Sequence, residues 1–198
     1  MTKKINDIGL FYLPMVVLPG ESTTLHVFEE RYKALVRDAI DEEKPFGILM
    51  PQKMNREYGS LVRVKEVTKS YHDGRFDIEI VGEDIFKILD KTDDPECLYD
   101  NAQVEPIKTE PGMIRDSLLN AYFEYSVKQL KHDPSYSFSK NMSVYELANK
   151  CDLTMIEKYK LISTSSPDIQ QNILQNHLNI VNALFNQEEA LKQKFYLN

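Results

Sequence analysis

The segment Leu10–Tyr32, with the sequence LFYLPMVVLPGESTTLHVFEERY, decides how the first half of this chain folds. Pro14 and Pro19 bracket the apolar run Met15–Leu18. Because proline cannot donate a backbone hydrogen bond, this run is predicted to be a short strand at a sheet edge or between bends. The Pro19–Gly20 pair then marks a turn. Beyond it, Thr23–Phe28 alternates polar and apolar residues, and this period of two predicts a half-buried strand.

From Glu29 onward the hydrophobic pattern changes to the period of an α-helix. Apolar residues recur at i, i+3, i+4 and i+7 spacing, while charged residues fill the other face. The residues of this apolar stripe are Tyr32, Leu35, Val36, Ala39 and Ile40.

Several short strands are predicted after this helix. The valines of Gly59–Tyr71 follow a period of two that slips once, as in a strand with a β-bulge. The Asp73–Gly74 pair predicts a tight hairpin with a type I′ turn, in which both residues have positive φ. The remaining predicted strands are Phe76–Ile80, Ile85–Leu89 beyond a bend at Gly82, and Tyr99–Val104. Short strands with one inserted helix predict a small, partly closed β-barrel rather than a βαβ sheet.

Composition shifts at Pro106–Gly112, and the chain beyond it has helical periodicity almost to its end. We therefore predict an α+β protein with a β-barrel domain over residues 1–110 and an α-helical bundle over residues 111–198. Ser143–Glu146 and Thr154–Glu157 both match the capping box, in which a hydroxyl and a carboxylate bind free amides at a helix start. Two short helices are expected there.

Two longer helices are predicted in the second half. Met113–Lys131 has helical spacing in a stripe of Leu119, Tyr122, Phe123, Val127 and Leu130. Ser166–Pro167 opens a long last helix, about Pro167 to Phe195, because proline is favoured at the first helical position. Its stripe includes Leu174, His177, Val181, Leu184, Glu188, Leu191 and Phe195. Such a stripe fits the inside of a bundle, which is the favoured interpretation, or a partner helix.

Composition limits the class and the compartment of the protein. A chain of 198 residues is long enough to bury a hydrophobic core. Cys97 and Cys151 lie far apart and outside any C-x-x-C pattern, so we interpret them as free thiols in a reducing cytoplasm. The first residues make a poor signal peptide, and no run approaches the roughly 20 apolar residues of a membrane helix.

The motifs of common enzymes do not occur in the sequence. An ATP-binding P-loop needs a glycine followed by Lys-Ser or Lys-Thr, and no glycine in this chain has that continuation. Gly59–Ser60 is the only Gly-Ser pair, and it opens a predicted strand rather than a nucleophile turn. The four histidines are not at metal-ligand spacing. We expect no catalytic residue, no metal and no cofactor.

Nucleic acid is also an unfavoured ligand. The net charge is −7 and the isoelectric point is about 5.2, which opposes non-specific attraction to phosphate. Lys65, Lys69, Arg75 and Lys87 could share adjacent strands, but acidic residues lie among them. Mixed charge of this kind makes a poor phosphate track.

The opening segment resembles a known family. The pattern L-F-x-L-P-x-V-x-x-P-G followed by L-H-V-F-E-x-R-Y is similar to the start of the substrate-binding, amino-terminal domain of Lon-type proteases, which also exists as a free-standing protein. PFGILM at Pro45–Met50 and DGRFDIEIVGEDIFKIL at Asp73–Leu89 extend the similarity. The family motif maps onto Pro14, Pro19, Gly20, Phe28, Glu29, Arg31, Tyr32, Gly47, Gly74 and Gly82.

The resemblance implies a fold and a function. The fold would be a PUA-like pseudo-barrel followed by a helical bundle. The function would be non-catalytic recognition of unfolded or extended protein segments, since a barrel edge offers unpaired backbone groups to an extended peptide. Candidate contact residues are Met15, Val17, Leu25, Val27 and Phe28, and plain core packing is the alternative for each.

Two other functions remain open from the sequence. The long last helix could mediate self-association into a homo-oligomer, or dock the chain on a partner such as a protease, which would make it an assembly or adaptor protein. A small-molecule site in the barrel is the third alternative, although no residue pattern indicates a particular ligand.

Overall fold

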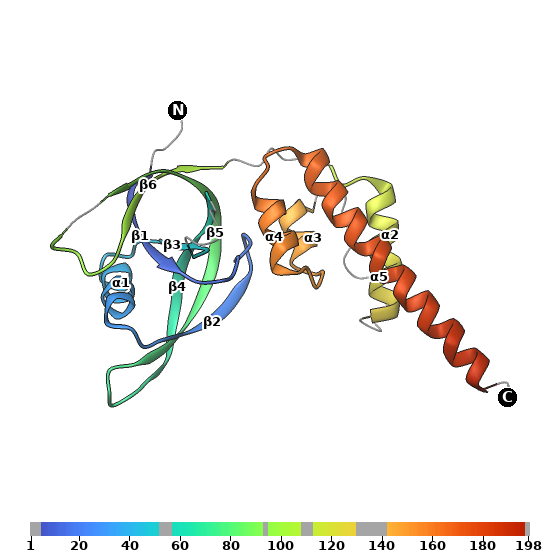
Figure 1. The fold of residues 1–198 in the computed structure, drawn as a ribbon, viewed down its shortest axis with the longest axis horizontal. Coiled ribbons are helices and arrows are strands. Elements are labelled where there is room, and N and C mark those ends of the chain that lie inside the picture. Colours follow the sequence, from blue (N-terminus) through green and yellow to red (C-terminus); the bar gives the residue numbers. More distant parts are fainter. Residues whose placement is uncertain (1–4, 52–56, 93–94, 108–112, 130–141, 197–198) are drawn as a thin grey trace. The chain divides into compact units, whose positions relative to one another are not determined.

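The computed structural model describes residues 5–51, 57–92, 95–107, 113–129 and 142–196. The chain divides into two compact units, Met1–Lys108 and Thr109–Asn198. The first contains the strands and one helix, and the second contains helices (Figure 1). The domain boundary predicted between residues 110 and 111 stays a prediction, because it lies outside the described residues.

The first unit is a mixed sheet that closes on itself. Its strands are β1 (Ile5–Tyr12), β2 (Ser22–Val27), β3 (Phe46–Leu49), β4 (Tyr58–Ser70), β5 (Phe76–Thr92) and β6 (Asn101–Pro106). They follow the order β2-β5-β4-β3-β1-β6, and β5 also pairs with β6. Because the long β5 pairs with β2, β4 and β6, the sheet curls into the pseudo-barrel in Figure 1. The prediction of a barrel with one inserted helix, α1 (Glu30–Asp41), is confirmed.

The opening segment differs from its prediction in one respect. Met15–Leu18 is not a strand, and the strand lies earlier, at β1. The backbone amides of this run bind partners outside any ladder: Val17 N–H donates to Ser60 Oγ at 3.0 Å, and Leu18 N–H donates to Glu21 Oε2 at 2.9 Å. Met15 N–H donates to the carbonyl of Leu13 at 2.8 Å, so the bracketing prolines mark a loop whose amides bind side chains and a local carbonyl rather than a neighbouring strand.

The β4–β5 hairpin also corrects two details. Gly82 does not end a strand, because β5 runs unbroken from Phe76 to Thr92. The turn is not type I′, since Gly74 has a φ of 80° but Asp73 does not have a positive φ. Tyr71 and Arg75 instead flank a three-residue loop that ends in a positive-φ glycine. The one predicted bulge corresponds to the register shift between Val64 and Glu66, and β4 and β5 have two further shifts, between Leu61 and Val62 and between Val67 and Lys69.

The barrel core lies between α1 and the sheet. The helix buries the predicted stripe except Ile40, and these side chains pack on the inner faces of the strands. Phe11 and Tyr32 stack with ring centroids 3.8 Å apart. Phe76, Ile78 and Ile80 supply the dry face of β5, as their alternation predicted.

The second unit contains α2 (Asp116–Gln129), α3 (Val144–Ala148), α4 (Met155–Ile162) and α5 (Pro167–Tyr196). Both predicted capping boxes are present. Ser143 Oγ accepts from Glu146 N–H at 3.0 Å, and Thr154 Oγ1 accepts from Glu157 N–H at 3.3 Å. The long last helix is confirmed and begins at Pro167. The end predicted for α2 near Asp133–Pro134 lies outside the described residues.

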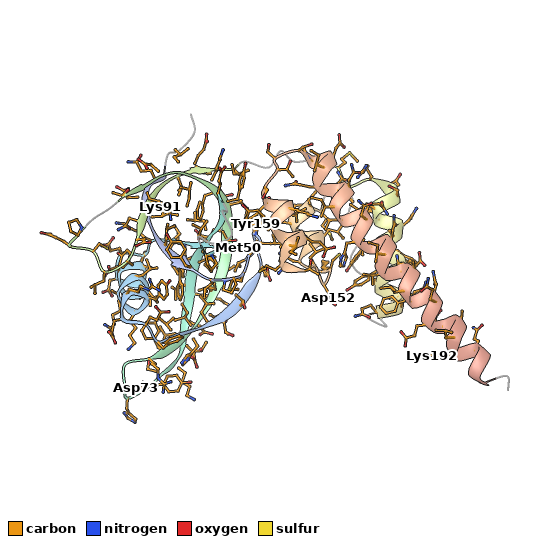
Figure 2. All side chains as sticks on the ribbon, in the orientation of Figure 1. Met50, Asp73, Lys91, Asp152, Tyr159 and Lys192 are labelled. Carbon is orange, nitrogen blue, oxygen red and sulfur yellow. The ribbon has the colours of Figure 1, made fainter. Side chains whose placement is uncertain are left out.

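The buried faces of α2 and α5 differ from the predicted stripes. In α2 the buried side chains include Leu118, Ala121 and Tyr125, whereas Phe123 and Val127 are exposed. In α5 the stripe is buried at Leu174 and His177, but Leu184 and Leu191 are exposed. Lys192 lies on this last part of α5, which extends past α2 (Figures 1 and 2). The spacing of apolar residues correctly predicted that each segment is a helix. It did not determine which face of the helix is buried, because apolar residues lie on more than one face.

Candidate functional site

The five residues predicted to contact a peptide lie in different environments. Val17, Leu25 and Val27 are buried in the barrel core. For these three residues the structure agrees with the alternative, which was plain core packing. Met15 is partly buried against the same core. Phe28 leaves 58% of its surface exposed. Phe28 and, in part, Met15 are the members of this set that offer apolar surface to a ligand.

Phe28 belongs to a surface cluster of rings that we call the aromatic patch (His26, Phe28 and Tyr71). The His26 ring centroid lies 5.9 Å from that of Phe28 and 5.6 Å from that of Tyr71. The Asp77 carboxylate binds both His26 and Tyr71: His26 Nδ1 lies 2.5 Å from Oδ1, and the Tyr71 hydroxyl donates to Oδ2 at 2.8 Å. The hydrogen bond with His26, and then that from Tyr71, hold the pKa of Asp77 below its usual range. This carboxylate is therefore charged at neutral pH and orients both rings.

A groove runs between α1 and β4 and ends beside the aromatic patch. It has two sections, with volumes of about 240 and 320 Å³, and both are lined by Ile40 and Val67. Tyr71 and Phe76 line the larger section. Val67 is 45% exposed, so the floor of the groove is apolar and open to solvent.

The strand that forms one wall of this groove is only partly paired on its outer side. β3 pairs with β4 from Gly59 to Val62 and no further. From Arg63 to Ser70, β4 pairs with β5 on one side and with no other strand among the described residues. This stretch, which we call the outer edge of β4, therefore presents backbone N–H and C=O groups toward the groove.

The charges on the groove walls are mostly basic. The larger section is lined by Arg37 and Arg75 and, within the part of the chain that the structure describes, by no carboxylate. Arg75 pairs with Asp73 at 2.7 Å. Figure 2 shows Asp73 at the tip of the hairpin, away from the barrel body. Arg37 makes no hydrogen bond or ion pair with the described residues, and its charge contributes to lowering the pKa of Glu30. The smaller section also holds Arg63 and Lys65, with Glu43 and Glu66.

The family-motif residues mainly build the scaffold. Gly20, with a φ of 78°, donates its amide to the carbonyl of Gly82 at 2.8 Å, and Gly82 donates to Glu21 at 2.9 Å. A Cβ on Gly47 would lie 2.9 Å from the Phe86 ring. Pro14 and Pro19 bracket the loop that carries these contacts.

The helix-start part of the motif is also structural. Arg31 pairs with Glu29 at 2.8 Å and lies over the Tyr32 ring, 4.5 Å from its centroid. The Tyr32 hydroxyl accepts a hydrogen bond from the amide of Tyr12 at 3.3 Å. These contacts fix the start of α1 against β1.

Reactive side chains do not gather into a second site in the described residues. No group of three or more His, Cys, Asp or Glu side chains there could hold a metal ion. Burial raises the pKa of the Cys151 thiol to about 12, so this cysteine is protonated and unreactive. His177 is buried and lies 3.0 Å from Glu157 Oε1, which ties α5 to the start of α4. No described helix has the length and apolar character needed to span a bilayer.

The sequence named Phe28 as a candidate, which the structure leaves exposed, but the prediction did not include the groove. The one available signal was a mismatch of lengths, because the Pro45–Met50 motif is shorter than the predicted strand Gly59–Tyr71 that follows it. A short strand beside a long one leaves part of the long strand unpaired. Which part stays unpaired depends on register, which the sequence pattern does not set.

The fold is that of the amino-terminal domains of Lon proteins. A solved Lon N-terminal domain protein from Xanthomonas campestris is 22% identical, with a TM-score of 0.67, and the match covers 86% of this chain and 98% of that one. The N-terminal domain of a Mycobacterium avium complex Lon protease is 14% identical, with a TM-score of 0.70 and coverage of 87% and 98%.

The family follows from the sequence as well. The model of the ATP-dependent protease La (LON) substrate-binding domain matches residues 8–184. The chain therefore belongs to the Lon substrate-binding domain family, as its opening motif indicated.

Proposed function

We propose that this protein binds unfolded or extended segments of other proteins and catalyses no reaction on them. Membership of the substrate-binding domain family over residues 8–184 is the observation that carries the proposal. The exposed ring of Phe28 supports it, because an aromatic side chain held at a surface is a usual anchor in protein recognition. Cytoplasmic location, expected from the free thiols, is part of the same proposal.

The test compares one protein in two states. A reduced, carboxymethylated protein with a tryptophan serves as the unfolded ligand, and the same protein with its disulfides intact serves as the folded one. This chain has no tryptophan, so the emission reports on the ligand alone. We expect saturable binding of the unfolded form and none of the folded form. Equal binding of both forms, or of neither, would refute the proposal.

A variant tests the contribution of the aromatic patch. Phe28→Asp is expected to weaken binding by about tenfold, since burying one aromatic side chain is worth roughly 1.5–3 kcal/mol and part of that surface is already covered. Leu98→Asp is the matched control, because Leu98 is also an exposed apolar residue of the barrel unit. Equal losses in the two variants would mean that Phe28 makes no specific contact.

A further inference from the structure

We propose that the outer edge of β4, from Arg63 to Ser70, takes up the bound segment as an additional strand, and that segments carrying aspartate or glutamate among their apolar residues bind best. This inference rests on the proposed function and specifies its surface and its ligand chemistry. The aromatic patch adjoins one end of this edge through Tyr71.

The backbone of the outer edge is suited to strand addition. It spans roughly eight residues, which at about 3.3 Å per residue gives an edge of about 26 Å. Its inward side is bonded to β5, while no described backbone group is bonded to its other side. An extended peptide that pairs there gains main-chain hydrogen bonds, and its alternate side chains face the apolar floor at Ile40 and Val67.

The charges along the groove select for acidic ligands. The protein as a whole carries −7, yet the larger section of the groove presents Arg37 and Arg75 without a carboxylate among its described lining residues. Arg37 is free of any ion pair with the described residues, so a ligand carboxylate there would not displace an existing partner. Lys69 lies over the Tyr71 ring at 4.7 Å, on the same edge. Charge complementarity of this kind raises both association rate and specificity.

The shape of the edge favours a single flexible segment over another folded sheet. Two of the β4–β5 register shifts fall within it, between Val64 and Glu66 and between Val67 and Lys69. Bulges and lysines on an edge strand disfavour pairing with a second flat sheet. A flexible segment can follow the bends, whereas the edge of a second copy would have to distort.

The probes are three labelled peptides of about ten residues, measured by fluorescence anisotropy. The first repeats Val-Val-Glu-Glu, so that each face of the strand carries both residue types, the second repeats Val-Val-Lys-Lys, and the third is the glutamate peptide with N-methyl groups on every second residue. N-methylation removes the donors that an added strand uses and leaves the side chains intact. We expect the glutamate peptide to bind at least about tenfold more tightly than either of the others.

Two variants locate the binding on the groove. Arg37→Glu and Val67→Glu are each expected to weaken the glutamate peptide by about tenfold. Lys87→Glu is the matched control, since it makes the same change of charge on a β5 residue outside the groove lining, and its effect should stay within about twofold. Arg37→Glu should also improve binding of the lysine peptide, a gain that misfolding cannot produce.

The outcomes distinguish a failure of the proposed function from a failure of strand addition at β4. If the wild-type chain binds no unfolded protein, the proposed function fails. If it binds unfolded protein but Arg37→Glu and Lys87→Glu lower affinity equally, or the N-methylated peptide binds as well as its parent, strand addition at this edge is refuted and the function stands. A dimer in sedimentation velocity that Val67→Glu dissociates would assign the edge to self-association and overturn the inference.

Discussion

Replacing Gly82 with alanine tests whether the barrel depends on the close packing of the opening loop against β5. A Cβ at this position would lie 2.2 Å from the carbonyl oxygen of Leu18 and 2.8 Å from its carbonyl carbon. Both are backbone atoms, so no side-chain rotation can relieve the clash. The loop that contains Leu18 must therefore move away from β5.

The expected cost follows from what that movement breaks. The loop is held by two hydrogen bonds at Gly82, from the amide of Gly20 and to the carbonyl of Glu21, each worth about 1 kcal/mol. Forcing extra volume into a packed core costs about 1–3 kcal/mol. Replacing glycine restricts the unfolded chain and returns roughly 0.4–1 kcal/mol. The net loss of unfolding free energy is about 2–4.6 kcal/mol, against a total of about 5–15 kcal/mol for a typical domain.

Hydrogen exchange measured by mass spectrometry suits this test, because peptides from the barrel report its unfolding separately from the helical unit. Gly74→Ala is the matched control. Its Cβ would make only an ordinary contact, with Lys33 Nζ at 3.7 Å, so the cost is the strain of a positive φ, about 1–2 kcal/mol, less the same return of roughly 0.4–1 kcal/mol. If Gly82→Ala were no more destabilising than Gly74→Ala, the close approach of the loop to β5 would not be the reason that glycine is required at position 82.

Three further predictions concern other parts of the molecule. Burial alone would raise the pKa of Glu157, but hydrogen bonds from Thr154 and His177 outweigh it and hold this pKa below its ordinary value. Its contribution to the stability of the helical unit is therefore complete above about pH 4.5 and is lost as pH falls through the lowered pKa, and Glu157→Gln should flatten that part of a pH-dependent unfolding curve. In the native protein, a chromogenic thiol reagent should react with Cys97 but not with the buried Cys151. Mass spectrometry should find both cysteines labelled only after denaturation. Glu43 follows the C-cap residue of α1, Glu42, and has a φ of 51°, so Glu43→Gly should raise the unfolding free energy by roughly 0.5–1 kcal/mol in the same exchange experiment.

The sequence predicted those elements whose signals are local. The capping boxes at Ser143 and Thr154 were readable because the hydroxyl and the carboxylate that bind each other are three residues apart. The alternation in Phe76–Ile80 and the stripe of α1 were readable because a buried face imposes a period on the residues of one element. The family motif was readable for the same reason, since each of its three parts, Leu10–Tyr32, Pro45–Met50 and Asp73–Leu89, is a continuous stretch.

The sequence could not predict features that depend on distant partners. Met15–Leu18 has the composition of a strand, but Val17 donates to Ser60, more than forty residues away, and not to a neighbouring strand. The exposure of Phe123 on α2 depends on which side of that helix α5 covers, and the hydrophobic period alone fits both sides. The groove depends on where β3 stops along β4, which is a matter of register between separate segments.

Apart from Phe28 and Gly74, the residues of the motif differ from those of the proposed contact surface, and this separation has a physical reason. Gly82 is needed because backbone approaches backbone, Gly20 because its φ is 78°, and Tyr32 because it stacks in the core, so a change at any of them disturbs the barrel. Arg37 and Val67 are solvent-facing and bind nothing that the fold requires, so they can change without a comparable loss of stability. A barrel held by one set of residues can therefore alter what it binds through the other. On this reasoning, ligand preference cannot be read from membership of the family, and it has to be established from the groove residues of each chain.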